Sequence, residues 1–247
     1  MSVLILQIDI GHGTQWGKEY AIDPIRKIFI PSVKKYAKKH SYDYQLVVES
    51  EYKKKGGDFL FLATPEKHLS FERYFHFNQK HESIVYIDND VYISNNAESL
   101  PEINGLMNAP EPEGNASKIF RERYNQPVNK NYYNSGVTFV DNKTAKNLQN
   151  YMLYRMKNKI RAKGKNSDNM MLNEYILENP SIFYELSNKW NYMPFLENST
   201  RIKKANFLHF VGIYGKNFLF QILKSNKNLT ILIEQLIESQ IDFKFRY

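Results

Sequence analysis

Two carboxylates separated by one residue follow a short apolar run in the first half of the chain. Residues 84–87 are β-branched or aromatic, and Asp88 and Asp90 come directly after them. In an open α/β sheet, ligands bind beyond the carboxyl ends of the strands, so these side chains would face a binding crevice. Neighbouring carboxylates repel each other unless a cation lies beside them, and Mg²⁺ or Mn²⁺ commonly shares such oxygen ligands with substrate phosphates. The pair therefore favours a metal-bridged diphosphate, and a polar turn at the end of a strand is the alternative.

Strand and helix patterns alternate up to this acidic pair. Asp23 before Pro24 supplies an N-cap and a proline at the first helical position, and Pro31 is expected to kink or split the helix that follows. Such an alternation favours parallel strands joined by right-handed crossover helices in a three-layer α/β domain. The expected strands are residues 3–8, 44–48 and 84–87, and the expected helices are residues 24–37 and 65–80.

The second half of the chain is less regular. Residues 104–131 contain several prolines and little periodicity, which predicts a loop-rich segment that shapes an acceptor site. No internal repeat, low-complexity segment or clear linker is present in the sequence, so a single domain is the simplest organisation. The remaining predictions are a strand at residues 133–140 and helices at residues 144–160, 167–178 and 229–239.

Composition limits the class of protein. A hydrophobic content of 42% over 247 residues is enough to bury a sizeable core, which argues against disorder. The longest apolar stretch, residues 207–223, is interrupted by His209 and Lys216 and falls short of the roughly 20 apolar residues of a membrane span. Residues 2–10 lack the basic start and cleavage site of a signal peptide. The absence of cysteine excludes disulfides and thiolate sites, so we expect a cytoplasmic protein without a transmembrane segment.

The formal net charge of +8 indicates an anionic partner. A nucleotide diphosphate, a nucleic acid and an acidic membrane surface all fit this charge, as does a proteome rich in lysine and asparagine. One alternative is therefore a basic nucleic-acid-binding module, in which tyrosines stack on bases beside lysine-rich patches. Charge runs are more often solvated helix faces, and no RNA- or DNA-binding signature accompanies them here. The lysine-rich patches are residues 34–39, 53–55 and 157–165.

The spacing of Asp88 and Asp90 after an apolar strand resembles the metal-binding DxD motif of the GT-A glycosyltransferases. Further matches occur in the order expected for the branch that contains glycogenin and the lipopolysaccharide galactosyltransferases, over roughly residues 3–218. Two departures are that Asn169 stands where the branch usually has glutamine, and that the last motif has one residue too many before Lys216. The matching motifs are Lys35-Tyr36-Ala37-Lys38-Lys39-His40 with Tyr42-Asp43-Tyr44, Tyr133-Asn134-Ser135-Gly136-Val137, Asp168-Asn169 with Leu172-Asn173, Trp190-Asn191, and His209-Phe210 with Gly212 and Lys216.

The resemblance implies a metal site with three protein ligands. Asp90 would bind the metal directly, Asp88 directly or through water, and His209 through an imidazole nitrogen. Mn²⁺ accepts both oxygen and imidazole ligands, so it suits this set, with Mg²⁺ as the second choice. His209 also lies in an apolar run, in which a lone histidine is usually a hydrogen-bonded core residue.

The resemblance also places a nucleotide diphosphate sugar, linked to UDP or GDP, at the ends of the strands. Asp9 would accept a hydrogen bond from a ribose hydroxyl or a base N–H, but the family's usual pattern is absent there, so the base stays open. Lys216 would stabilise the leaving diphosphate as a point charge, and Gly212 would let the backbone approach the phosphates. Strand-end polarity and surface lysines are the structural alternatives. The residues implied in donor binding are Ile8, Asp9, Ile10, Gly11, Arg73, Asp88, Asn89, Asn134, Ser135, Gly136, Gly212 and Lys216.

Asp168 and Asn169 are the implied catalytic residues, with Asp168 the carboxylate nearest the anomeric carbon. Asp168 also begins a predicted helix, where an aspartate commonly serves as the N-cap. The His-Phe-x-Gly resemblance favours retention of configuration, in which the leaving diphosphate helps to deprotonate the acceptor. An inverting enzyme would instead need a carboxylate base such as Asp168, Glu111 or Glu113.

The resemblance implies a three-layer α/β/α GT-A fold, a Rossmann-like nucleotide-diphospho-sugar transferase with a mainly parallel central sheet. Within one domain over residues 1–247, residues 1–100 would form the nucleotide-binding half and residues 101–220 the acceptor and sugar-binding half, with a C-terminal helix in residues 221–247. The expected activity is metal-dependent transfer of a hexosyl or pentosyl group to a glycan or glycoconjugate. No nucleic-acid partner is expected, and peripheral membrane contact stays open.

Two further alternatives fit the acidic pair. A phosphatase of the haloacid dehalogenase type also carries Asp-x-Asp after a hydrophobic strand, but near the chain start and with a downstream acidic pair, which the second half of this sequence lacks. A carbohydrate-binding relative without turnover would keep the same motifs. The sequence identifies neither the donor sugar nor the acceptor, and it leaves the oligomeric state open.

Overall fold

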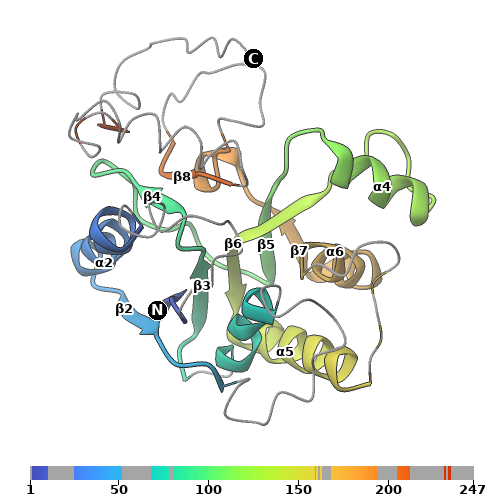
Figure 1. Cartoon of the computed structure of the whole chain (residues 1–247), viewed down its shortest axis with the longest axis horizontal. Coiled ribbons are helices and arrows are strands. Elements are labelled where there is room, and N and C mark those ends of the chain that lie inside the picture. The colour runs from blue at the N-terminus through green and yellow to red at the C-terminus, as the bar shows by residue number, and fades with distance from the viewer. Residues whose placement is uncertain are drawn as a thin grey trace.

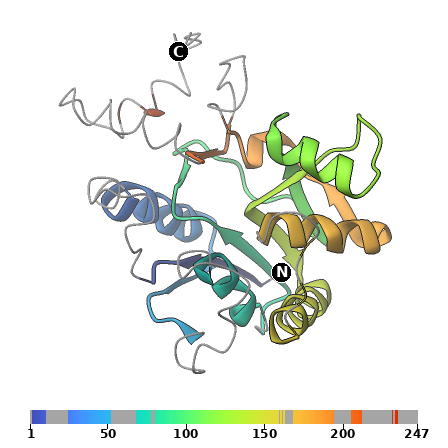
Figure 2. The same ribbon diagram turned by 45° about the vertical axis from the view of Figure 1, so that its right-hand side comes forward.

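The computed structural model has a central sheet of six strands with helices on both faces (Figure 1, Figure 2). Helix α2 (Ile30–Lys39) packs against one face, and η4 (His68–His76), α5 (Asn142–Lys157) and α6 (Asp168–Glu178) pack against the other. This arrangement confirms the expected three-layer architecture. The structure describes residues 2–10, 25–51, 68–77, 80–158, 160, 162, 168–193, 205–211, 231, 233 and 234.

The strand order of the sheet is β2-β1-β3-β6-β5-β7. Strand β1 is parallel to β2 and β3, and β5 is parallel to β7, whereas β6 runs antiparallel to both of its neighbours. The sheet is therefore mainly parallel, as expected, with β6 reversed. The strands are β1 (Val3–Ile8), β2 (Asp43–Val47), β3 (Ser83–Ile87), β5 (Leu106–Pro110), β6 (Tyr133–Asp141) and β7 (Phe183–Glu185).

Side chains alternate along β1 and β3 between two hydrophobic cores. Ile5 and Val85 pack on the α2 side of the sheet, whereas Leu6 and Ile84 pack on the side of η4, α5 and α6. Strands covered on both faces have no polar side, so they appear in the sequence as continuous apolar runs. This double burial is the reason that both strands were correctly predicted.

The first helix changes geometry next to the proline that was expected to split it. Residues of η2 (Ile25–Phe29) form a π-helix, and α2 begins at Ile30 with Pro31 in its first turn. Proline has no N–H, and the first turn of an α-helix leaves such donors without a partner in the helix, so Pro31 is tolerated there. The predicted start at Asp23 and Pro24 lies outside the described residues.

The helix predicted before β3 is a 3-10 helix, η4, and it is shorter than expected. Tyr74 faces the core, as predicted, and Glu72 is buried as well. The Glu72 carboxylate accepts hydrogen bonds from Ser50 Oγ at 2.8 Å and from the backbone N–H of Glu51 at 2.6 Å. These bonds tie η4 to the segment that follows β2, which sets the position of Arg73 on the same helix.

Residues 104–131 are not loop-rich, and that prediction was wrong. They contain strand β5 and helix α4 (Asn115–Arg123). The strand is only five residues long, and its register with β6 shifts between Asn108 and Pro110, where proline ends the ladder. The prolines therefore mark the boundary of a short strand, and no long periodic pattern exists for a sequence argument to detect.

A second, two-stranded sheet lies beyond the end of β3. It pairs β4 (Val91–Ile93) with β8 (Phe207–His209) in antiparallel orientation, so that His209 lies opposite Val91. This pairing brings a residue from late in the chain to the turn after β3 (Figure 1). The short helices η5 (Pro180–Ile182) and η6 (Asn188–Trp190) flank β7 in the chain.

Only part of the helix predicted at residues 229–239 lies within the described residues. Within residues 229–239, the described residues 231, 233 and 234 are helical, and Ile233 is buried. In the described part of the chain, no helix combines the length and the apolar character needed to cross a membrane.

The turn into β5 depends on a glycine. Gly105 has a φ of 66°, and a Cβ built there would lie 2.2 Å from the carbonyl oxygen of Ile182. Asp141 stabilises the same turn, since its carboxylate accepts from Gly105 N at 2.6 Å while it also caps α5 by accepting from Thr144 N at 2.7 Å. The start of β5 and the start of α5 are therefore joined at one side chain.

Gly105→Ala is expected to lower the free energy of unfolding by about 2 kcal/mol, because alanine must adopt a left-handed backbone and its Cβ would meet a backbone oxygen. Urea unfolding followed by circular dichroism measures this loss. Gly114 is the matched control, since its φ of −163° is extended and a Cβ there would come no closer than 3.8 Å to Pro112 O. The change for Gly114→Ala is expected to stay below about 1 kcal/mol, a loss that reflects the weak N-cap preference of alanine at the start of α4. Equal losses for the two variants would contradict this account of the turn.

Candidate active site

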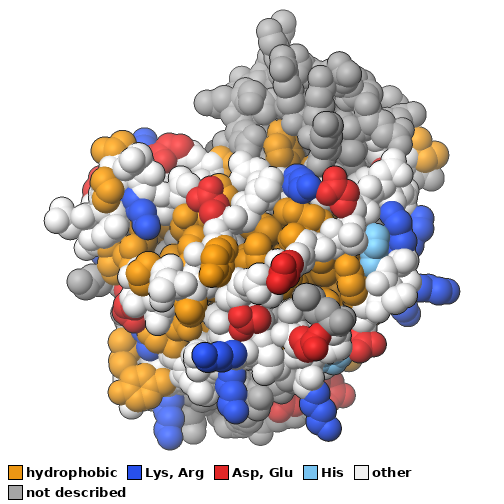
Figure 3. Space-filling view, turned by 180° about the vertical axis from the view of Figure 1, so that it is seen from behind, with side chains coloured by type: hydrophobic (Ala, Val, Ile, Leu, Met, Phe, Trp, Pro, Cys, Tyr) orange, Lys and Arg blue, Asp and Glu red, His pale blue; other side chains and the backbone are white. Residues whose placement is uncertain are grey.

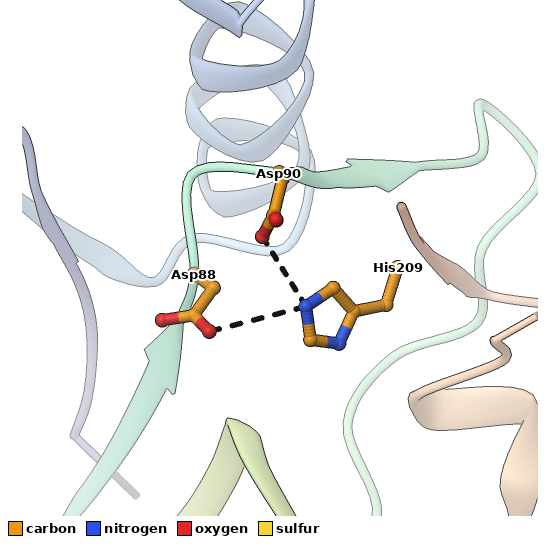
Figure 4. Close-up of side chains that lie close together, drawn as sticks. All are labelled: Asp88, Asp90 and His209. Carbon is orange, nitrogen blue, oxygen red and sulfur yellow. Dashed lines mark ion pairs between the residues drawn. The ribbon is translucent and has the colours of Figure 1, made fainter. Parts of the chain in front are cut away.

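Three side chains of the kinds that can ligate a metal meet beyond the end of β3 (Figure 4). Asp88 and Asp90 belong to the turn after β3, and His209 ends β8. His209 Nε2 lies 3.2 Å from Asp90 Oδ1 and 3.9 Å from Asp88 Oδ2. Each of the three residues offers one potential ligand atom, and these three atoms all lie within 4.8 Å of one another. Two carboxylate oxygens and one imidazole nitrogen form a donor set that suits Mn²⁺.

Hydrogen bonds hold the acidic turn in place. Asp88 N donates to Gly136 O at 2.7 Å, which extends the pairing of β3 with β6, and Val91 N donates to Asp88 O at 3.2 Å. The hydroxyl of Tyr86, two positions earlier on the same side of β3, donates to Asp88 Oδ1. Because Oδ1 is engaged by Tyr86, Oδ2 is the oxygen that faces His209.

The strand pairing of β8 and a side-chain amide hold His209. Its backbone N–H donates to Tyr192 O at 2.8 Å, and its side chain is buried. Nδ1 of the ring lies 2.9 Å from Asn191 Oδ1, while Nε2 points toward the two carboxylates (Figure 4). His209 is thus a hydrogen-bonded core histidine, and its other ring nitrogen faces the acidic pair.

The local charges favour an additional cation. Burial raises the pKa of Asp88, and Asp90 raises it further, although Arg73 opposes the shift. For His209, burial alone would lower the pKa, but the negative charges of Asp90 and Asp88 raise it above its ordinary value. Burial and the neighbouring carboxylate both disfavour the charged form of Asp88, and a divalent cation beside the pair would offset both effects.

A buried ion pair links η4 to the start of α6. Arg73 pairs with Asp168 and donates to Ser135 O in β6, and Ser135 Oγ donates to Asp168 Oδ2 at 2.6 Å. The guanidinium lies 4.1 Å from the ring centroid of Tyr86, the residue that holds Asp88. Burial opposes the charge of Arg73, but Tyr86 and Asp168 outweigh it and raise its pKa. The ion pair therefore couples the predicted catalytic carboxylate to the acidic turn.

The first turn of α6 is clamped to the start of β6. Asn169 Oδ1 accepts from Ser135 N at 2.9 Å, and Asn173 exchanges two hydrogen bonds of 2.8 Å with the backbone of Tyr133. The predicted catalytic residues Asp168 and Asn169 thus lie beside the strand predicted to line the sugar pocket.

Asn134 and Gly136 lie against the metal-ligating group. Asn134 Oδ1 accepts from Gly136 N at 2.8 Å and from Asn191 Nδ2 at 3.2 Å, and Asn134 Nδ2 donates to Glu111 Oε2 at 3.2 Å. A Cβ at Gly136 would lie 2.2 Å from His209 Cε1. Glycine at this position is therefore a condition for the close approach of the imidazole.

The end of β1 lies beside the acidic turn. Asn89 Nδ2 donates to Ile8 O, and Asp9 N donates to Val47 O at 2.7 Å. The side chains of Ile8 and Ile10 are buried in the hydrophobic core, so only their backbone is suited to contact a ligand. Three predicted donor-binding residues lie outside the described part of the chain: Gly11, Gly212 and Lys216.

The chain matches a known sequence family over most of its length. The profile of Glycosyl transferase family 8 matches residues 27–216, a range that includes Asp88, Asp90 and His209. The chain belongs to glycosyltransferase family 8. Its sequence matches none of the curated proteins with which it was compared.

Two solved structures have a fold similar to that of this chain. A glycosyltransferase involved in the glycosylation of the major capsid of PBCV-1 aligns with a TM-score of 0.52 and 18% sequence identity, over 90% of this chain and 100% of the other. The galactosyltransferase LgtC, in complex with donor and acceptor sugar analogs, aligns with a TM-score of 0.51 and 13% identity, over 93% of this chain and 97% of the other. The fold is that of the GT-A glycosyltransferases.

Family and fold together identify the family 8 chain as a glycosyltransferase. This confirms the expected fold and enzyme class and decides against the phosphatase. On the face seen in Figure 3, Lys and Arg side chains are interspersed with Asp and Glu around hydrophobic ones.

Tyr86 and Asn191 have roles in the candidate site that were not predicted from the sequence. Tyr86 holds Asp88, and its position two residues upstream on the same face of a strand was the available signal. Asn191 contacts His209, and it was noticed only as part of a motif match. Glu111 was considered as a catalytic base, whereas in the structure it accepts a hydrogen bond from Asn134.

Arg73→Met is expected to cost about 3–5 kcal/mol of stability, because it leaves Asp168 largely buried without its positive partner. Adding Asp168→Asn removes that stranded charge and is expected to recover about 1–3 kcal/mol of the loss. Urea unfolding of both single variants and the double variant measures this coupling. Strictly additive losses would show that the two side chains act independently.

Gly136→Ala is expected to push the His209 ring away from the acidic turn, because the new Cβ would lie 2.2 Å from His209 Cε1. A crystal structure of the variant should show His209 Nε2 and Asp90 Oδ1 farther apart than 3.2 Å. Overpacking should also cost about 1–3 kcal/mol of stability. An unchanged cluster in that crystal structure would disprove the steric argument.

Proposed function

We propose that the chain is a metal-dependent glycosyltransferase that moves a hexosyl or pentosyl group from a nucleotide diphosphate sugar to a glycan or glycoconjugate. The observation that carries the proposal is the grouping of Asp88, Asp90 and His209 within 4.8 Å beyond the end of β3, in a chain of family 8. This edge of the sheet is where open α/β folds bind their ligands.

Mn²⁺ is the first choice of cation for this group, and Mg²⁺ is the second. Mg²⁺ prefers oxygen ligands and retains several waters, whereas Mn²⁺ accepts an imidazole nitrogen beside two carboxylates. When bound, the cation would neutralise charge on the diphosphate and so improve it as a leaving group. The close approach of the His209 ring that Gly136 permits and the repulsion between Asp88 and Asp90 support this choice.

The donor would extend along the sheet edge from β1 to α6. Asp9 follows the end of β1, where a nucleoside of UDP or GDP type would bind, and Arg73 and Asp168 would lie toward the sugar. Residues 1–100 would then supply most of the nucleotide site, and residues 101–220 the sugar and acceptor side of a single domain.

The three carboxylates considered as bases for an inverting reaction already have partners in the structure, which supports retention. Asp168 is paired with Arg73, and Glu113 is paired with Arg121. Glu111 accepts a hydrogen bond from Asn134 at 3.2 Å. Each of these three candidate carboxylates thus already has a partner in the described part of the chain. In a retaining reaction, the diphosphate itself would accept the proton of the acceptor hydroxyl.

A thermal-shift panel of UDP, GDP and their sugar derivatives, with and without Mn²⁺, tests the proposal, because a ligand that binds only the native state raises Tm. One nucleotide series is expected to stabilise the protein in Mn²⁺ and to lose that effect in EDTA. Asp90→Ala is expected to abolish the Mn²⁺-dependent shift while the variant still unfolds cooperatively without metal.

Asp43→Ala is the control for that variant, since Asp43 lies at the start of β2 with its side chain 73% exposed. It should retain the full Mn²⁺-dependent shift. A full shift in Asp90→Ala would rule out the assigned metal site. No shift with any nucleotide, together with stabilisation by RNA, would favour a nucleic-acid-binding function instead.

A further inference from the structure

We propose that Asn134 and Asn191 are positioning residues that fix the tautomer of His209, so that its Nε2 presents a lone pair to the metal. The inference rests on the proposed metal-dependent function and deepens it. Neither asparagine would contact the cation, and both would act through the imidazole. The chain of hydrogen bonds runs from β6 through the residue after η6 to the end of β8.

The direction of the chain is set by a backbone group. The two ends of an asparagine amide are hard to tell apart by shape, so their assignment depends on the hydrogen-bond partners. Gly136 N is a backbone donor and cannot accept, and it lies 2.8 Å from the Asn134 amide. The atom of Asn134 that faces Gly136 must therefore be the oxygen.

The same oxygen determines the next two links. Asn191 lies 3.2 Å from Asn134 Oδ1, so it must present its NH₂ group there. Its own oxygen then faces His209 Nδ1 at 2.9 Å, and an oxygen acceptor requires a protonated Nδ1. The neutral ring consequently carries its lone pair on Nε2, the nitrogen directed at both carboxylates in Figure 4.

The other end of the chain gives the same direction independently. Asn134 Nδ2 lies 3.2 Å from Glu111 Oε2, and a carboxylate oxygen accepts a hydrogen bond. A reversed Asn134 would place its oxygen against this carboxylate and its NH₂ against Gly136 N. Both contacts would be repulsive, so Glu111 and Gly136 jointly exclude the reversed amide.

Burial makes the orientation costly to lose. The exposed fraction is 3% for Asn134 and 1% for both Asn191 and His209. Water therefore has little access to replace a missing partner, and an unsatisfied polar group in such a place is expensive. A partner on the second nitrogen of a metal-binding histidine fixes the ring and raises its basicity, and its removal typically lowers metal affinity about 10- to 100-fold.

Asn191→Leu and Asn191→Asp separate positioning from packing. Leucine has nearly the same shape but cannot accept from Nδ1, whereas aspartate keeps the acceptor but replaces the donor to Asn134 with a second oxygen, which repels Asn134 Oδ1. Titration of Mn²⁺ alone into each protein by calorimetry should show an affinity about 10- to 100-fold below wild type for Asn191→Leu. Asn191→Asp should retain more affinity than Asn191→Leu, because a carboxylate still accepts from the imidazole N–H, and more strongly than an amide does.

A second readout is the choice between cations. Mg²⁺ depends on oxygen ligands more than on imidazole, so Asn191→Leu should lose less affinity for Mg²⁺ than for Mn²⁺. A residue that only packs the core would change both affinities by the same factor. Asn179, which donates to Tyr175 O at the end of α6, provides matched controls, since Asn179→Leu and Asn179→Asp should leave both affinities unchanged.

The outcomes distinguish this inference from the proposed function. If wild type binds no Mn²⁺, the proposed function fails and the inference fails with it. If wild type binds Mn²⁺ and Asn191→Leu binds it equally well, or better than Asn191→Asp, only the inference is overturned. Thermal melting in EDTA shows whether each variant folds. If Asn191→Leu does not fold, Asn191→Ala replaces it in the titrations, because alanine also lacks an acceptor for Nδ1.

Discussion

The negative charge gathered beyond β3 governs how the surrounding residues are arranged. Asp88 and Asp90 repel each other across one intervening residue, and neighbouring side chains stabilise them with hydrogen-bond donors and positive charge. Tyr86 donates to Asp88, and His209 faces both carboxylates. Arg73 lies against the ring of Tyr86 and pairs with Asp168. A cation beside the two carboxylates would relieve their repulsion, and this is the basis of the proposed metal-dependent function.

Strand β6 is the element on which these contacts converge. It runs antiparallel to β3, with Ile87 at the end of β3 opposite Val137 near the start of β6. The first residues of β6 therefore lie at the same edge of the sheet as the last residues of the parallel strands. Reversal of this one strand brings Asn134 and Ser135 to the ligand edge. There they contact the histidine network on one side and the first turn of α6 on the other.

Strong local patterns were sufficient to predict much of the fold. The strands buried on both faces and the long helices of the second half lie within a few residues of their expected positions. Strand β5 was missed because it has five residues and ends at Pro110, so its pattern is too short to separate from a loop. The 3-10 geometry of η4 was also missed, since apolar spacing resembles that of an α-helix over so few turns.

The sequence by itself determined which groups are available for chemistry and at which edge they lie, because the acidic pair directly follows an apolar strand. The resemblance to the GT-A glycosyltransferases implied the other candidate site residues. Tertiary structure alone decided which of them are partners. Arg73 meets Asp168 across 95 residues, and Asn191 meets His209 across 18. Such pairs depend on strand register and on burial, which no local pattern encodes. The tautomer of His209 is likewise set by a backbone N–H in a distant strand.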